Sequence, residues 1–282
     1  MKHSVRIFEV GPRDGLQNEP GIISTKNKIK LIDKLSECGY KRIEATSFVA
    51  PKWVPQMADA EAVMAGIKRH PKTKYTALTP NLQGLERALK AKVDEIAIFA
   101  AASETFSYKN INCTIEESLA RFDLVLKQAT HFKIPIRGYV SCVVACPYEG
   151  KINPSNVAKL AQKLIEMGCY EISLGDTIGV GQPNDIARML DIVCKYVAPS
   201  HLAGHFHDTK KYALNNIRRA LDYGLRVFDS SIAGLGGCPY APGASGNVNT
   251  TAVVEMLHKE GFSTGIDINK LKTVEQFAKT LI

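Results

Sequence analysis

Residues 153–176 read NPSNVAKLAQKLIEMGCYEISLGD and contain one complete helix–strand unit. The first part places apolar residues at helical spacing, with Ser155 or Asn156 available as the N-cap and Gly168 as the stop signal. The second part, residues 170–176, has the length and apolar content of a strand and ends in the polar Asp176. The stretch therefore predicts a helix that leads straight into a buried strand.

The same unit recurs along the whole chain. Candidate strands occupy residues 5–11, 42–48, 74–80, 95–101, 135–144, 170–176, 202–208 and 226–236. Amphipathic stretches separate them, such as the one from Thr25 to Cys38, which Gly39 ends. Eight strands that alternate with helices predict parallel βαβ units and a (β/α)8 TIM barrel. A doubly wound open sheet is the alternative, but no glycine fingerprint follows the first strand.

The organisation along the chain is simple. No linker or shift in composition divides the 282 residues, so we expect a single TIM-barrel catalytic domain over residues 1–282. The segment after the eighth unit is expected to be a short C-terminal helical extension. No apolar run approaches the length of a membrane helix, and the N-terminus enters a strand-like run at once. These features predict a cytoplasmic protein with no membrane partner.

Charge and cysteine content exclude some classes of function. The net charge is +8, but the lysines and arginines are scattered without interleaved aromatic residues. This distribution favours a small anionic ligand, such as a phosphate-bearing thioester, over nucleic acid. The seven cysteines are irregularly spaced, and several, such as Cys142 and Cys169, have apolar neighbours. They are interpreted as reduced core thiols rather than disulfides or a zinc site.

Polar residues gather where the predicted strands end, which is the end of a TIM barrel that carries active sites. They are Arg13 and Asp14 after the first strand, Glu44 and Ser47 on the second, Arg137 and Tyr139 on the fifth, Asp176 and Thr177 at the sixth, and His205 and His207 at the seventh. Two of them have simpler interpretations. Asp176 is also suited to cap the next helix, and Glu44 is also suited to neutralise Arg13 or Arg137.

The two histidines in AGHFHDT, residues 203–209, are one residue apart and would share one face of a strand. They could form an acid–base pair or only mark the polar end of a buried strand. With Asp14 at the same rim, they are better interpreted as metal ligands. Two imidazoles and a carboxylate leave open positions on an octahedral divalent ion, suited to a substrate that chelates through two oxygens.

The stretch GLGGCPYAPGASGN, residues 234–247, follows the eighth strand and contains a single cysteine, Cys238. It is either a surface loop without function or a mobile segment above the proposed metal site. In the second case Cys238 can reach a bound substrate and act as a proton donor or acceptor.

Five segments together resemble the 3-hydroxy-3-methylglutaryl-CoA lyases, a family of metal-dependent barrels that break a carbon–carbon bond next to a thioester. They are VGPRDGLQNE, TSFVAPKWVPQMAD, SLGDTIGVG, HFHDT and GLGGCPYAPGASGN, and the resemblance covers nearly the full chain. The first and fourth segments alone would indicate only the wider superfamily, whereas the cysteine-bearing segment is more specific and points to the lyases. The sequence departs from the usual pattern at Pro20, Phe206 and Lys210-Lys211, which leaves the contacts around the acyl chain open.

The resemblance implies specific roles. It assigns a Mg²⁺ or Mn²⁺ ion to Asp14, His205, His207 and Asn247, and it makes Arg13, Cys238, His205, Glu44 and Asp176 the catalytic set. Substrate contacts are expected from Arg13, Ser47, Arg137, Tyr139 and Thr177. The implied reaction converts 3-hydroxy-3-methylglutaryl-CoA to acetyl-CoA and acetoacetate, in a homodimer. A Claisen-type synthase or an aldolase of the same superfamily is the enzymatic alternative, and a basic scaffold that binds nucleic acid is the non-enzymatic one.

Overall fold

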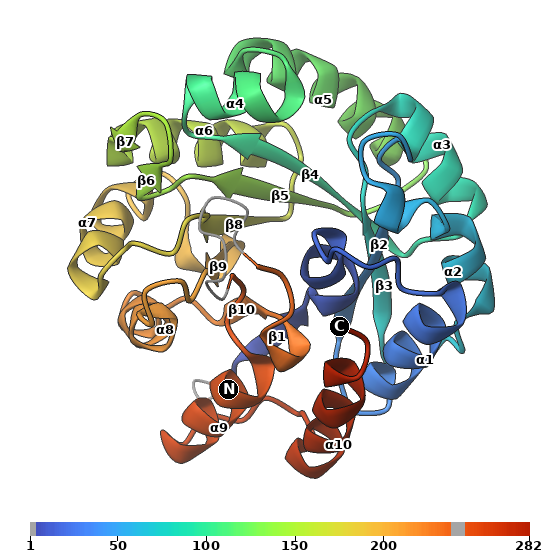
Figure 1. The fold of residues 1–282 in the computed structure, drawn as a ribbon. Helices are drawn as coiled ribbons and strands as arrows, with labels where there is room; N and C mark the ends of the chain where they lie inside the picture. Colours follow the sequence, from blue (N-terminus) through green and yellow to red (C-terminus); the bar gives the residue numbers. More distant parts are fainter. Residues whose placement is uncertain (1–3, 238–245) are drawn as a thin grey trace.

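The computed structural model describes residues 4–237 and 246–282. Within them, eight parallel strands close into a barrel in the order β1-β10-β9-β8-β5-β4-β3-β2 (Figure 1). These strands are β1 (Arg6–Glu9), β2 (Arg42–Ser47), β3 (Lys74–Leu78), β4 (Glu95–Ala101), β5 (Ile136–Ser141), β8 (Glu171–Asp176), β9 (Leu202–Phe206) and β10 (Val227–Ser230). The predicted TIM barrel is confirmed, and the doubly wound alternative is wrong because the first strand, β1, pairs with the last, β10, and closes the sheet.

Helices surround the barrel and alternate with its strands (Figure 1). They are α1 (Thr25–Ser36), α2 (Ala60–Gly66), α3 (Leu82–Lys90), α4 (Glu104–Ile111), α5 (Ile115–His131), α6 (Pro154–Glu166), α7 (Pro183–Val193), α8 (Ala213–Asp222), α9 (Thr250–Lys259) and α10 (Ile268–Lys279). None of the described helices is both long and apolar enough to cross a membrane.

The cap of α6 differs from the prediction. Asn153, rather than Ser155 or Asn156, is the N-cap, and its side chain accepts a hydrogen bond from the backbone N–H of Ser155. Pro154 explains the shift, because a proline fits the first helical position, where no N–H partner is needed. Gly168 follows the helix at a φ of 113°, a left-handed conformation that suits the predicted stop.

Two strands end three or more residues earlier than predicted. The fifth strand stops at Ser141 because Cys142 has a φ of 60°, which turns the chain out of the sheet. The eighth stops at Ser230, and a 3₁₀ turn, η4 (Ile232–Gly234), begins two residues later and has Ala233 at a φ of 58°. After β5 the chain forms a small antiparallel pair, β6 (Ala145–Cys146) and β7 (Gly150–Lys151), outside the barrel.

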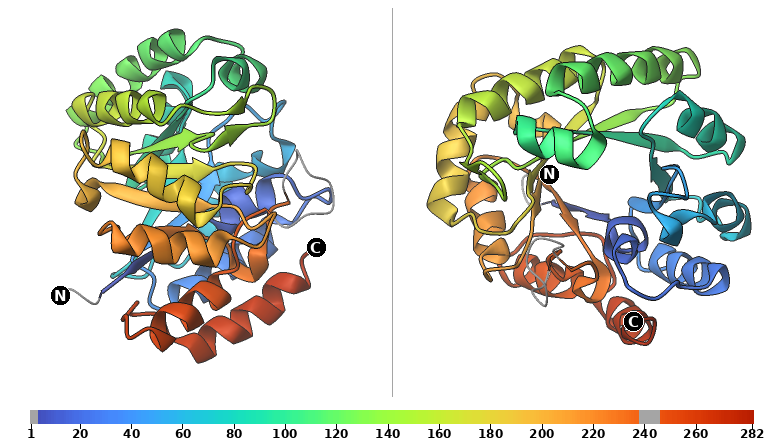
Figure 2. Two further views of the ribbon diagram at one scale, coloured as in Figure 1. Left: turned by 90° about the vertical axis from the view of Figure 1, so that its left-hand side faces the viewer. Right: turned by 45° about the horizontal axis from the view of Figure 1, so that its top comes forward.

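The C-terminal extension is helical, as predicted. Helices α9 and α10 lie together along one side of the barrel (Figure 2), and α10 also contacts α1 and η4. The parallel bridge between Ser4 and Ser263 ties the segment between them to the start of the chain.

The main apolar core lies between the strands and the surrounding helices, whereas much of the barrel interior is charged. Arg137 on β5 is 1% exposed and forms ion pairs with Glu171 on β8 and Asp229 on β10. Leu and Val commonly fill this space in TIM barrels. Buried charges require partners and hydrogen bonds to offset their desolvation. The ion pairs of Arg137 with Glu171 and Asp229 provide such partners, directly beneath the rim where the polar residues gather.

Candidate active site

A single turn of π-helix, η1 (Gly11–Gly15), follows β1 and carries Arg13 and Asp14. The Arg13 side chain is buried, and its Nε lies 2.6 Å from Oε2 of Glu44 on β2. Its Nη1 lies 2.6 Å from Oδ1 of Asp14. Burial opposes ionisation of Asp14, but the positive charge of Arg13, together with His205, His207 and the hydrogen bond from Asn247, outweighs it and lowers the pKa of this carboxyl to about 2. Asp14 is therefore a carboxylate at neutral pH.

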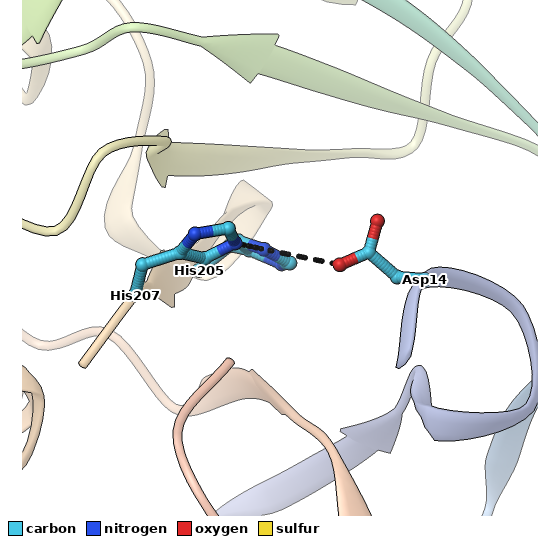
Figure 3. Close-up of side chains that lie close together, drawn as sticks. All are labelled: Asp14, His205 and His207. Carbon is cyan, nitrogen blue, oxygen red and sulfur yellow. Dashed lines mark hydrogen bonds and ion pairs between the residues drawn. The ribbon is translucent and has the colours of Figure 1, made fainter. Parts of the chain in front are cut away.

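The two histidines meet Asp14 across the barrel mouth (Figure 3). His205 and His207 lie at the end of β9, and their Nε2 atoms are 3.2 Å apart. The Nε2 of His205 is 4.0 Å from Oδ2 of Asp14, and one ligand atom from each of the three residues lies within 4.8 Å of the others. The prediction that the histidines share a face and converge with Asp14 is thus met by the geometry.

The protonation of the histidines suits ligation. Burial, with a smaller contribution from His205, lowers the pKa of His207 to about 4, so its imidazole is neutral at physiological pH. For His205 burial acts in the same direction, but the hydrogen bond to Asp229 and the negative charges of Asp229 and Asp14 together outweigh it and raise the pKa.

Asn247 lies beside this group. It forms an antiparallel bridge with His207, and its Nδ2 donates to Oδ2 of Asp14 at 2.8 Å and to the carbonyl oxygen of Leu235 at 3.2 Å. A Cβ at Gly236 would stand 2.8 Å from this nitrogen, so the glycine permits the close approach. In this orientation the amide supports the carboxylate; as a ligand it would turn its oxygen toward the cation.

The donor set fits a divalent cation. One carboxylate oxygen and two imidazole nitrogens converge, with an amide next to them. Carboxylate and amide oxygens suit Mg²⁺ and Mn²⁺, and imidazole suits the transition metals. The two imidazole Nε2 atoms face each other at 3.2 Å, where one neutral ring can donate a hydrogen bond to the other, and a cation bound by both nitrogens would take the place of that proton.

Tyr139 on β5 forms one wall of the site. Its ring meets His205 edge-on at 6.2 Å between centroids, and the Arg13 guanidinium lies 5.5 Å from its centre. The hydroxyl is buried without a hydrogen-bond partner in the described part of the chain. A buried hydroxyl without a partner is costly, so this group is suited to contact a bound molecule.

The other predicted residues lie at strand ends with local partners. The Ser47 hydroxyl accepts from the backbone N–H of Val49, and the Thr177 hydroxyl accepts from that of Cys142. Asp176 holds the segment after β8 through the N–H of Gly181, and burial raises its pKa to about 6. Asp176 is not the N-cap of α7, a position that Gln182 occupies.

Arg137 lies lower in the barrel than the other predicted substrate contacts. Its Nε donates to Glu171, and both terminal nitrogens donate to Asp229. The predicted catalytic cysteine, Cys238, lies outside the described residues.

Sequence reasoning missed Asp229, whose Oδ2 lies 3.1 Å from Nδ1 of His205. The sequence did contain a signal for it. Asp229 lies inside the predicted eighth strand, two residues after Val227 and therefore on the same buried face, where a charged residue needs a partner.

Comparison with known proteins agrees with this geometry. Residues 4–278 match the model of the HMGL-like family. The chain belongs to the HMGL-like family. It is 57% identical to the mitochondrial hydroxymethylglutaryl-CoA lyase of Homo sapiens, over 97% of this chain and 84% of that protein. It is 55% identical to the cytoplasmic 3-hydroxy-3-methylglutaryl-CoA lyase of Mus musculus, over 97% of this chain and 80% of that protein.

Solved structures of the same family superpose closely. The HMG-CoA lyase of Brucella melitensis has a TM-score of 0.98 at 55% identity and covers 99% of this chain and 98% of its own. The lyase of Acinetobacter baumannii, in complex with coenzyme A and 3-methylmalate, has a TM-score of 0.94 at 39% identity. That match covers 100% of this chain and 92% of the other. The TIM barrel and the membership of the HMGL-like family, both expected from sequence, are confirmed.

Proposed function

We propose that this protein cleaves 3-hydroxy-3-methylglutaryl-CoA to acetyl-CoA and acetoacetate with a bound Mg²⁺ or Mn²⁺ ion. The observation that carries the proposal is the convergence of Asp14, His205 and His207 beside the buried Arg13. The identity of 55–58% with hydroxymethylglutaryl-CoA lyases over nearly the whole chain supports the reaction and the substrate.

The cation and the residues around it have different roles in the proposed reaction. The cation supplies a Lewis acid that polarises substrate oxygens. Arg13 faces the same space and offsets the negative charge that develops on the thioester oxygen. Glu44 and Asp14 fix the Arg13 side chain from two sides, so this charge is positioned before the substrate arrives. Ser47, Tyr139 and Thr177 are proposed to contact the substrate. Arg137, which was also expected to do so, is buried and donates to Glu171 and Asp229, so no substrate contact is proposed for it.

Proton transfer requires a base for the tertiary hydroxyl and an acid for the departing acetyl group. Asp14 and His205 are the candidate bases, with Asp176 behind them. A carboxylate with a pKa near 2 accepts a proton poorly at neutral pH, which favours His205. Cys238 is proposed as the acid that delivers the proton to acetyl-CoA.

The test is an assay of purified protein treated with a chelator, with acetoacetate and acetyl-CoA followed separately. We expect cleavage to disappear on chelation and to return when Mg²⁺ or Mn²⁺ is added back. Cleavage that survives complete removal of metal would contradict the proposal. Condensation of acetyl-CoA with a 2-oxo acid, without cleavage, would instead support the synthase alternative.

Two further properties belong to the proposal. We infer a homodimer of single-domain subunits, which the molar mass in solution tests directly. We also infer a cytoplasmic location; relatives of similar identity are named both cytoplasmic and mitochondrial.

A further inference from the structure

Asp229 is a buried carboxylate beneath the proposed metal site. It lies on β10, next to β9 in the barrel, and is 2% exposed. Its Oδ2 is 3.1 Å from Nδ1 of His205, the ring nitrogen that points away from Asp14. Asp229 therefore contacts a proposed ligand from behind.

Three donors fix this carboxylate in place. Arg137 holds both oxygens, with Nη2 2.7 Å from Oδ1 and Nη1 3.0 Å from Oδ2. The Ser173 hydroxyl donates to Oδ2 at 2.7 Å. A bidentate guanidinium pair of this kind constrains direction as well as distance, so Asp229 cannot turn away from His205 without breaking it.

The chemistry of the contact decides which nitrogen of His205 carries the proton. An ionised carboxylate only accepts hydrogen bonds, so Nδ1 must be the donor. In a neutral ring Nε2 then carries the lone pair. Nε2 is the atom that faces Asp14 at 4.0 Å and His207 at 3.2 Å.

We propose that Asp229 is a positioning residue that fixes the tautomer and ring orientation of His205, and that Arg137 acts through Asp229. The proposal rests on the proposed function, since it takes His205 as a metal ligand. Carboxylates behind ligating histidines commonly raise metal affinity by one to two orders of magnitude. Arg137 is 1% exposed and donates to two buried carboxylates, so its role here is to hold Asp229 rather than to contact substrate.

The test compares Asp229→Asn with a matched control, Glu171→Gln. Glu171 is also buried and also pairs with Arg137, at 2.8 Å, but it bonds to Arg137 and Arg6 rather than to a proposed ligand. Two quantities are measured for each variant and the parent. One is the His205 tautomer, from imidazole ¹⁵N resonances at mildly alkaline pH, assigned by their loss in His205→Gln. The other is the Mn²⁺ affinity from calorimetry.

We expect Asp229→Asn to shift the His205 ring from a single tautomer to a mixture and to weaken Mn²⁺ binding by about 10- to 100-fold. Glu171→Gln should leave the tautomer unchanged and the affinity within about threefold of the parent, because it removes no contact to the ligand. The proposal is overturned if the asparagine variant keeps the parent tautomer or the parent affinity. It is also overturned if both variants lose affinity equally, since the network would then be only structural.

Two outcomes keep this test separate from the proposed function. If the parent protein binds no Mn²⁺, the metal-dependent function fails, while the tautomer measurement still decides the role of Asp229. If Asp229→Asn does not fold, Ser173→Ala removes one donor to the same oxygen. That variant should populate the second tautomer measurably, and an unchanged tautomer would count against the proposal.

Discussion

Glu9, the last residue of β1, is expected to make the stability of the protein depend on pH. Its side chain is fully buried and accepts four hydrogen bonds. The N–H groups of Gly11 and Ile232 donate to Oε1 at 2.8 Å, and the hydroxyls of Tyr40 and Thr250 donate to Oε2 at 2.9 Å. The carboxylate thus joins the turn that carries Arg13 and Asp14 to the segment after β10. Burial nevertheless outweighs these bonds and raises its pKa from 4.5 to about 7.

The sign and size of the effect follow from linkage. Between pH 4.5 and about 7, Glu9 keeps its proton in the folded state and loses it in the unfolded state. The folded state binds more protons there, so the free energy of unfolding falls as pH rises and levels off above the folded pKa. The rise of the Glu9 pKa from 4.5 to about 7, at roughly 1.4 kcal/mol per pH unit, lowers the free energy of unfolding by about 3 kcal/mol across this pH range.

Glu9→Gln tests this prediction, because its oxygen still accepts both backbone N–H groups and its amide donates to hydroxyls that can rotate. Unfolding by urea is followed across and above the window. The difference in unfolding free energy, variant minus parent, should grow by about 3 kcal/mol with pH and then become constant. Glu86→Gln, at an exposed position on α3, is the control and should show no such trend. A difference for Glu9→Gln that is independent of pH would refute the reasoning.

Two further substitutions test the site itself. His207→Ala removes one of the converging ligands and should weaken Mn²⁺ binding by more than about tenfold in calorimetry, whereas the exposed His131→Ala should not; retained affinity would show that His207 is not a ligand. Cys238→Ser should slow turnover by roughly two to four orders of magnitude, the usual contribution of a positioned acid or base. Its Mn²⁺ affinity should stay unchanged, and turnover within about threefold of the parent would exclude the proton-transfer role.

The sequence by itself determined the barrel and most of the rim. Helix and strand periods are local, so the repeated helix–strand unit was visible without any knowledge of contacts. The same local rule placed His205 and His207 on one face of a strand. The position of Arg13 and Asp14 followed from a general property of the fold, since active sites of TIM barrels lie where the strands end.

Only the tertiary structure decided how those residues act on one another. Asp229 and His205 are 24 residues apart and meet because β9 and β10 are neighbours in the closed barrel. Arg137 could equally have faced a substrate, and its pairing with Asp229, 92 residues away, depends on barrel closure. Such pairings across the barrel depend on strand register and on the competition among several buried charges for a few partners. Strand register and the competition for partners cannot be read from the sequence period. The period of a strand specifies which face a residue occupies, but not which residue lies opposite it.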